Sequence, residues 1–188
     1  MLPVPRRTAE QTRQLILDTA IAVAAEGGSL ALTLDAVVER LPVSKGALLH
    51  HFPTKTALLE GMIDELARQH VAEVRAEAAK DPEPYNRNAR AAMRVSVDNP
   101  GDEKDLVLGR AALVASAIDP ALAQRWRAGT AVLAEDDPVD PAGRDDALML
   151  RLLANGLWMS DLFGLFDVTP DQRRAIGALL TGPAEPPL

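Results

Sequence analysis

The sequence contains no cysteine among its 188 residues. This absence excludes a disulfide framework, a thiolate metal site and a cysteine nucleophile, and it agrees with a reducing cytoplasm. The first residues, MLPVPRRTAEQ, include no apolar stretch of the signal-peptide kind, so secretion is disfavoured. The most apolar segment, residues 147–166, is interrupted by Arg151, Asn155 and Asp161, which leaves no run of about 18 apolar residues to span a bilayer. We therefore expect a cytoplasmic protein without a membrane span.

Catalytic and metal-binding motifs are also missing. The sequence has no G-x-S-x-G, no H-E-x-x-H and no phosphate loop of the G-x-x-x-x-G-K type. The adjacent His50 and His51 would lie about 100° apart on a helix, which disfavours a shared metal ion. The acidic stretch 134–147 lacks the glycine and ligand order of a calcium loop, so we expect a solvated loop. The sequence thus predicts no enzyme, no metal and no cofactor.

Charge is distributed unevenly along the chain. The net charge is −7, yet residues 1–55 contain six basic and five acidic side chains, so the acidic excess follows residue 55. This asymmetry is typical of a small anion-binding domain joined to an acidic one.

Apolar residues recur at three- and four-residue steps through most of the chain, which predicts an all-α fold. Thr8 and Gln11 fit a capping box at the start of a first helix, and Gly27 with Gly28 fits its end near residue 26. Further helices are expected at residues 85–97, 103–117, 120–135, 144–165 and 170–181.

Two short helices follow the first. Thr33 caps one that must end near Arg40, because Pro42 disfavours helical geometry in the residue before it. Ser44 caps the next, over residues 45–51. Two short helices joined by such a turn constitute a helix-turn-helix.

Thr54 caps a long fourth helix that runs to about residue 79. We accordingly predict an N-terminal three-helix DNA-binding domain over residues 1–53. Residues 54–188 are predicted to form a helical ligand-binding and dimerisation domain.

A face for DNA follows from the residue types in these helices. The small residues Gly46 and Ala47 allow the second helix of the motif to approach the floor of the major groove. The starts of the capped helices favour a phosphate oxygen, and the first two arginines form a basic arm. The predicted DNA contacts are Arg6, Arg7, Thr33, Ser44, Lys45, Gly46, Ala47, Leu49, His50, His51 and Lys55.

At these residues the chain resembles the TetR family of bacterial transcriptional regulators, whose pattern reads roughly T-x-x-x-[IV]-A-x-x-[AS]-G-V-S-x-G-x-[LV]-Y-x-[HY]-F-x-[ST]-K-x-x-L. The matching residues are Thr33, Val37, Val43, Ser44, Gly46, Leu48, His51, Phe52, Thr54, Lys55 and Leu58. Two positions depart from the pattern: Pro42 replaces the turn glycine, and Leu49 replaces the tyrosine that usually touches phosphate. The resemblance covers about residues 8–66 and implies a DNA-binding repressor that a small molecule releases from its operator.

The helix expected at residues 144–165 is apolar nearly all round, and one chain cannot bury every side of it. The segment 152–165 is also similar to a helix that pairs subunits in the family. We therefore predict a homodimer that binds near-palindromic double-stranded DNA. The predicted interface residues are Leu153, Leu157, Trp158, Leu162, Ile176 and Leu180.

The resemblance further implies a small-molecule effector bound in the C-terminal domain, of apolar or weakly polar character. Candidate contacts, each more typical of a core residue, are Met62, Leu66, Met93, Leu113, Trp126, Trp158 and Met159. The alternative is a helical protein-interaction module that has lost DNA binding. A neutral surface around Lys45 would favour that alternative.

Overall fold

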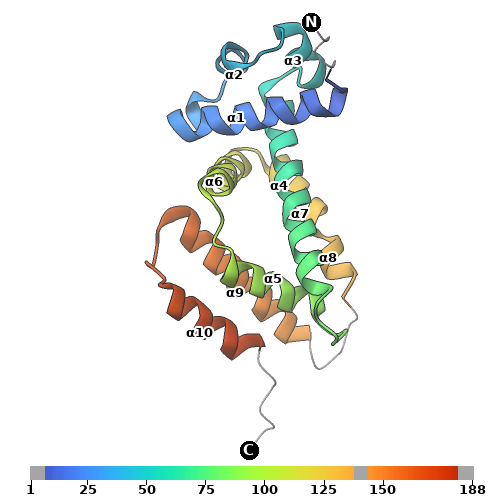
Figure 1. The fold of residues 1–188 in the computed structure, drawn as a ribbon, viewed down its shortest axis with the longest axis vertical. Coiled ribbons are helices and arrows are strands. Elements are labelled where there is room, and N and C mark those ends of the chain that lie inside the picture. Colours follow the sequence, from blue (N-terminus) through green and yellow to red (C-terminus); the bar gives the residue numbers. More distant parts are fainter. Residues whose placement is uncertain (1–6, 138–143, 182–188) are drawn as a thin grey trace, which may run out of the picture. The chain divides into compact units, whose positions relative to one another are not determined.

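The computed structural model describes residues 7–137 and 144–181, which form helices joined by short connections and contain no strand (Figure 1). This confirms the predicted all-α fold. The helices are α1 Ala9–Ala31, α2 Leu34–Arg40, α3 Lys45–His51, α4 Lys55–Ala78, α5 Arg87–Asp98, α6 Glu103–Ile118, α7 Pro120–Thr130, α8 Val132–Glu135, α9 Arg144–Phe163 and α10 Pro170–Thr181. No helix within the described ranges is long and apolar enough to cross a membrane.

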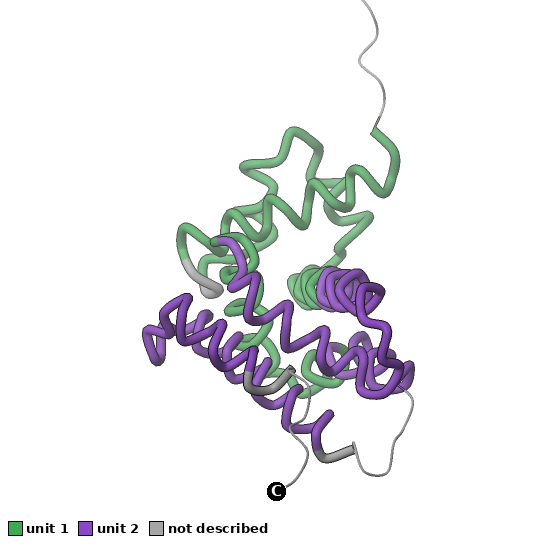
Figure 2. Tube along the Cα trace, turned by 60° about the horizontal axis from the view of Figure 1, so that its bottom comes forward, with its two compact units in different colours: residues 1–66, 103–125 green, residues 67–102, 126–188 purple. Residues whose placement is uncertain are grey.

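The chain divides into two compact units (Figure 2). Residues up to 66 form the first unit together with residues 103–125, and residues 67–102 form the second together with those from 126 onward. The predicted domain boundary after residue 53 stays a prediction.

In the first unit, α1 packs against α2, α3 and α6. Figure 1 shows α2 and α3 on one side of α1 and α6 on the other. The core includes Leu17 of α1, Leu48 of α3 and Leu58 of α4, all fully buried. A Cβ atom at Gly61 of α4 would lie 2.5 Å from the Phe52 ring, so only glycine lets this ring sit against α4.

Two exposed ion pairs also join helices of the first unit. The Lys104 ammonium of α6 lies 2.8 Å from the Asp18 carboxylate of α1. The Arg125 guanidinium of α7 donates two hydrogen bonds, of 2.6 and 2.7 Å, to the Asp64 carboxylate of α4.

The predicted end of the first helix near residue 26 is wrong, because α1 continues through Gly27 and Gly28 to Ala31. Glycine lowers helix stability by about 1 kcal/mol relative to alanine but does not by itself end a helix. The chain leaves α1 at Leu32, whose backbone is extended and whose side chain is fully buried.

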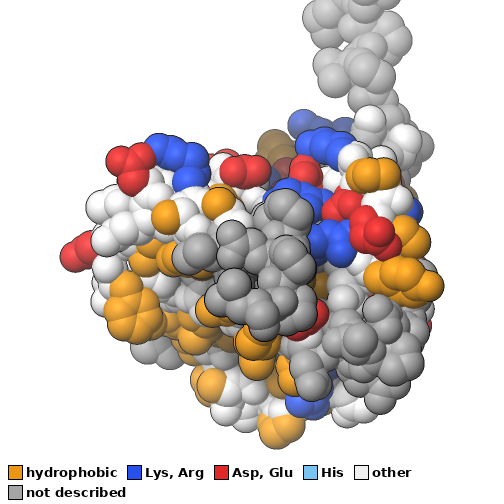
Figure 3. Space-filling model, turned by 90° about the horizontal axis from the view of Figure 1, so that it is seen from below, with side chains coloured by type: hydrophobic (Ala, Val, Ile, Leu, Met, Phe, Trp, Pro, Cys, Tyr) orange, Lys and Arg blue, Asp and Glu red, His pale blue; other side chains and the backbone are white. Residues whose placement is uncertain are grey.

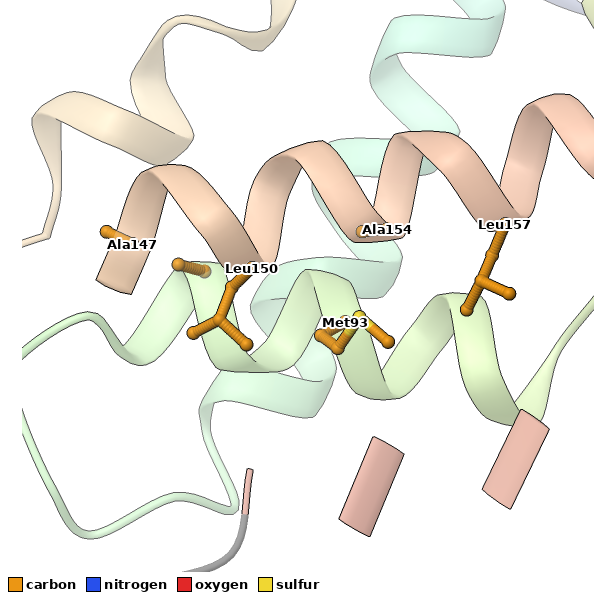
Figure 4. Packing of buried hydrophobic residues seen from close by; sticks show 6 residues of the cluster. Met93, Ala147, Leu150, Ala154 and Leu157 are labelled. Carbon is orange, nitrogen blue, oxygen red and sulfur yellow. The ribbon is translucent and has the colours of Figure 1, made fainter. Parts of the chain in front are cut away.

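In the second unit, α5 packs against α9 and α10. Its core consists of buried residues from α5 and α9, shown in Figure 4, where Leu150 and Leu157 extend from α9 toward α5. A second buried cluster joins the end of α4 to α5 and α8. The helix α5 is therefore covered on more than one side.

The single helix predicted over residues 120–135 is wrong, since a turn at Ala131 separates α7 from α8. The Thr130 hydroxyl donates to the Trp126 carbonyl oxygen at 3.1 Å, a contact that competes with regular helical geometry.

Asp137 corrects the expectation that the acidic stretch 134–147 is a solvated loop. Its side chain is buried and accepts hydrogen bonds from the backbone N–H groups of Asn88 (2.7 Å) and Ala89 (3.2 Å). Arg151 of α9 donates to the same carboxylate at 3.0 Å. The local N-cap residue, Asn86, makes no side-chain capping bond, so Asp137 caps α5 from a distance in sequence. Residues 138–143 of the stretch lie outside the described residues.

Candidate nucleic-acid interface

The helix-turn-helix is fixed locally by the three predicted caps. The side-chain oxygens of Thr33, Ser44 and Thr54 accept the backbone N–H of the residue three positions later, at 3.1, 3.2 and 3.0 Å. Between the short helices, Leu41 has an extended backbone (φ −87°, ψ 136°), as Pro42 requires. The turn thus forms without the glycine of the family pattern.

The second helix of the motif, α3, buries one side and exposes the other. Leu48 is fully buried, and Phe52, which follows α3, is 3% exposed. The exposed positions of α3 are Lys45, Gly46, Leu49 and His50, whereas Ala47 and His51 are half-buried. Spacings of one, four and five residues place the exposed positions on one helical face. In helix-turn-helix proteins the exposed face of the second helix enters the major groove, so this face is the candidate recognition surface.

Lys45 does not present an isolated positive charge. Its ammonium lies 2.7 Å from the Asp35 carboxylate of α2, and both side chains are largely exposed. Ion pairs in such positions contribute up to about 1 kcal/mol to stability, so the contact is easily exchanged. Asp35 was not among the predicted site residues. The signal for it was an acidic residue in the first turn of α2, where the helix dipole favours one.

The remaining predicted DNA contacts flank α3. Lys55 is exposed in the first turn of α4, next to the Thr54 cap. Thr33 is exposed at the start of α2, and Arg7 is exposed just before α1. Arg6 lies outside the described residues. The DNA-binding role of all of these residues stays a prediction.

The two histidines of α3 lie next to each other at the end of the helix. The rings of His50 and His51 meet edge to face, with centroids 5.4 Å apart. Among the residues that the structure describes, no group of three or more histidine, aspartate or glutamate side chains could hold a metal ion.

The predicted subunit-pairing residues occupy different environments. Leu157 and Leu162 are buried in the chain itself, and Leu157 belongs to the core between α5 and α9. These two residues therefore pack within the single chain, and their place in a subunit interface stays a prediction. Leu153 is exposed, Trp158 is half-buried, and Ile176 packs partly buried against the α5–α9 core. The Leu180 side chain lies outside the described part of the structure.

An apolar face of α9 is left exposed in the single chain. Its members are Leu148, Met149, Leu152, Leu153, Met159 and Phe163, which are between 37% and 61% exposed. Their spacing of three, four and seven residues places them along one side of the helix. The view from below in Figure 3 shows hydrophobic side chains at the surface in several separate places. Exposed apolar faces of this kind mark protein–protein contact sites.

The candidate effector contacts also separate by burial. Met62, Leu66 and Met93 are core residues, 1%, 8% and 0% exposed. Trp126 and Trp158 are half-buried, and their rings stack with centroids 6.0 Å apart.

Comparison with known proteins identifies the two parts of the chain. The family model for bacterial regulatory proteins of the tetR family matches residues 16–62. The model for the tetracyclin repressor-like C-terminal domain matches residues 86–185, which is more than half of the chain. No curated protein matches the chain.

Solved structures share the fold. A transcriptional regulator from Rhodococcus sp. Rha1 is 25% identical, with a TM-score of 0.68 over 90% of this chain and 94% of that one. A TetR-family member from Streptomyces coelicolor A3 is 24% identical, with a TM-score of 0.67 over 90% and 97% of the two chains. The multidrug binding protein EbrR, complexed with imidazole, is 19% identical, with a TM-score of 0.62 over 97% and 98%. The chain described here belongs to the TetR family of bacterial transcriptional regulators.

Proposed function

We propose that the protein is a cytoplasmic homodimeric repressor that binds a near-palindromic operator and is released from it by a small molecule. The observation that carries the proposal is the recognition face of α3. Lys45, Leu49 and His50 are exposed on it, while Leu48 anchors the opposite side in the core. A rigidly anchored short helix with an exposed polar and apolar face is suited to reading base edges.

Contacts to phosphate would hold this helix in register. The Thr33 and Thr54 hydroxyls are already engaged as caps, so the free N–H groups nearby and the Lys55 ammonium are the groups left to bind phosphate oxygens. Such contacts position the protein without reading sequence, whereas the α3 side chains would supply the sequence preference.

Dimerisation is supported by the exposed face of α9. A symmetric dimer would bury the apolar side chains of both copies of this face in one self-complementary interface. Two recognition helices related by the two-fold axis would then read two half-sites.

Release by an effector requires the ligand to prefer the conformation that does not bind DNA. EbrR, a structural neighbour, is described as a multidrug binding protein. This likeness in fold supports a small-molecule site in the C-terminal domain of the present chain.

A second function, binding of a protein partner instead of DNA, is favoured by one observation. The Lys45–Asp35 ion pair makes the middle of the recognition face close to neutral. A neutral face would bind phosphate weakly and would suit a protein surface better.

Selection of bound fragments from a random pool of double-stranded DNA separates the two functions. The repressor proposal predicts enrichment of a near-palindromic sequence. Recovery of unenriched DNA, or of no DNA at about 100 mM salt, would support the protein-interaction alternative.

A further inference from the structure

Three aromatic rings from three different helices meet within the second unit. The rings of Trp126 on α7 and Trp158 on α9 are parallel to within 6°, with centroids 6.0 Å apart. The imidazole of His70 on α4 lies on the same indole of Trp126, with centroids 5.9 Å apart and an interplanar angle of 36°. We call His70, Trp126 and Trp158 the aromatic cluster.

A close approach of two helices assembles one side of the cluster. A Cβ atom at Gly129 would lie 2.8 Å from the Ala67 Cβ atom, so α7 contacts α4 where neither residue has a larger side chain. His70 and Trp126 each lie three residues, or about one helical turn, from this contact. The small pair Ala67 and Gly129 therefore brings the imidazole and the indole together.

The three rings are not members of the two buried clusters described above. The buried residues of those two clusters are alanine, valine, leucine and methionine. All three rings of the aromatic cluster remain half-buried, and they include both tryptophans of the whole chain. Aliphatic residues thus supply the packing of these two clusters, while the three rings are partly open to solvent.

We propose that the aromatic cluster is the effector-binding surface and that its ligand is a flat aromatic molecule without an acidic group. The proposal rests on the small-molecule release described above. Parallel indoles with centroids in this range prefer offset stacking, and a planar ligand extends the stack at little conformational cost. The electron-rich faces of the indoles attract neutral or cationic rings and repel carboxylates and phosphates.

His70 would supply the polar contact of this surface. Burial lowers the pKa of His70, which keeps its imidazole neutral at pH 7. A neutral imidazole has one N–H donor and one acceptor nitrogen, so it pairs with a hydroxyl or an aromatic nitrogen of the ligand.

Two compounds with the same carbon skeleton test the stacking. 2-Naphthol is flat and aromatic, whereas decahydro-2-naphthol is saturated and puckered and carries the same hydroxyl. Calorimetric titration of the full-length protein at pH 7 is expected to show 2-naphthol binding about ten-fold more tightly, in line with the strength of aromatic stacking. Equal affinities, or no binding of 2-naphthol, would overturn the proposal.

Variants then locate the binding surface. Trp158→Leu is expected to remove the ten-fold preference for 2-naphthol, and Trp158→Phe is expected to retain most of it. Phe166→Leu is the matched control, because Phe166 is an exposed aromatic residue outside both the aromatic cluster and the exposed face of α9. If Trp158→Leu keeps its helical circular dichroism and also keeps the preference, the site is elsewhere and the proposal fails.

The same titrations distinguish this site from the DNA-binding function. Binding of 2-naphthol by a protein that enriches no DNA would leave the aromatic site standing and remove the repressor function. Specific DNA binding together with equal affinity for 2-naphthol and decahydro-2-naphthol would leave the repressor function standing and remove the aromatic site.

Discussion

The Lys45 ammonium of α3 and the Asp35 carboxylate of α2 form a 2.7 Å ion pair across the turn of the helix-turn-helix. The pair ties the two short helices together at their exposed side. It also places a negative charge beside the recognition face, so DNA must compete with Asp35 for Lys45.

Replacement of Asp35 should strengthen DNA binding. In Asp35→Asn, Lys45 is free to contact DNA and a repulsion with phosphate is removed, so affinity for random duplex should rise by on the order of five-fold at low salt. Fluorescence anisotropy with a labelled duplex measures the change. Glu39→Gln, at an exposed acidic residue of the same helix, is the control and should give a smaller effect. Unchanged or weaker binding by Asp35→Asn would mean that Lys45 does not face DNA.

Lys55 should bind phosphate without reading sequence. A lysine in the first turn of α4 is mildly unfavourable next to the positive end of the helix dipole, a conflict that a bound anion resolves. Lys55→Ala should weaken binding to selected and random DNA by similar factors and reduce the slope of log affinity against log salt by about one unit. Lys80→Ala, at an exposed lysine after α4, should leave the slope unchanged. An unaltered slope in Lys55→Ala would refute the phosphate contact.

The exposed face of α9 should hold the dimer together. Leu152 is 61% exposed in the single chain, so Leu152→Glu should not disturb the monomer fold. Across a two-fold axis the change introduces like charges into an apolar contact, which should weaken the dimer by about 100-fold or more. Sedimentation velocity over a concentration series measures the change, with Ile118→Glu, 77% exposed on α6, as the control. A variant that remains as dimeric as the wild type would place the interface elsewhere.

Asp81 should make the second unit sensitive to acid. Hydrogen bonding to Arg90, followed by that to Arg94, holds the pKa of Asp81 well below its ordinary value of 3.8, although partial burial opposes the shift. A carboxyl group whose pKa is lowered by folding stabilises the folded state fully at pH values above its unfolded pKa. This contribution is lost as the pH falls from the unfolded pKa to the folded pKa. Asp81→Asn should therefore show a weaker fall in the free energy of unfolding between about pH 5 and about pH 2.

Urea titrations at several pH values test this expectation. Asp98→Asn, at an exposed position that ends α5, should keep the wild-type pH dependence. The same pH dependence in Asp81→Asn and the wild type would contradict the assigned role of this carboxyl group.

The parts of the fold that sequence predicted well depend on local chemistry. The caps of α2, α3 and α4 and the capping box of α10 use side chains within three residues of the N–H groups that they satisfy. The end of α2 follows from Pro42 in the same local way. Contacts between residues far apart in sequence were not predictable. The capping of α5 by Asp137 depends on how α8 and α9 return to α5.

The sequence also did not predict which side of the apolar helix α9 is buried within the chain. Leu153 and Leu157 both fit the predicted pairing face of α9, yet only the packing of α5 decides that Leu157 is inside. The aromatic cluster likewise depends on the contact between Ala67 and Gly129. No local sequence pattern predicts that these two small residues contact each other. Most of the predicted DNA contacts lie in or beside α3, where local caps fix the fold, and their role in DNA binding stays a prediction.

Two copies of this chain are expected to bind one two-fold operator. Hydroxyl-radical footprinting of the selected DNA, combined with light scattering of the complex, tests it most directly. We expect two protected half-sites about one helical turn apart, roughly 10 base pairs centre to centre, occupied by a dimer. Tight and specific protection of one half-site by a single chain would contradict it.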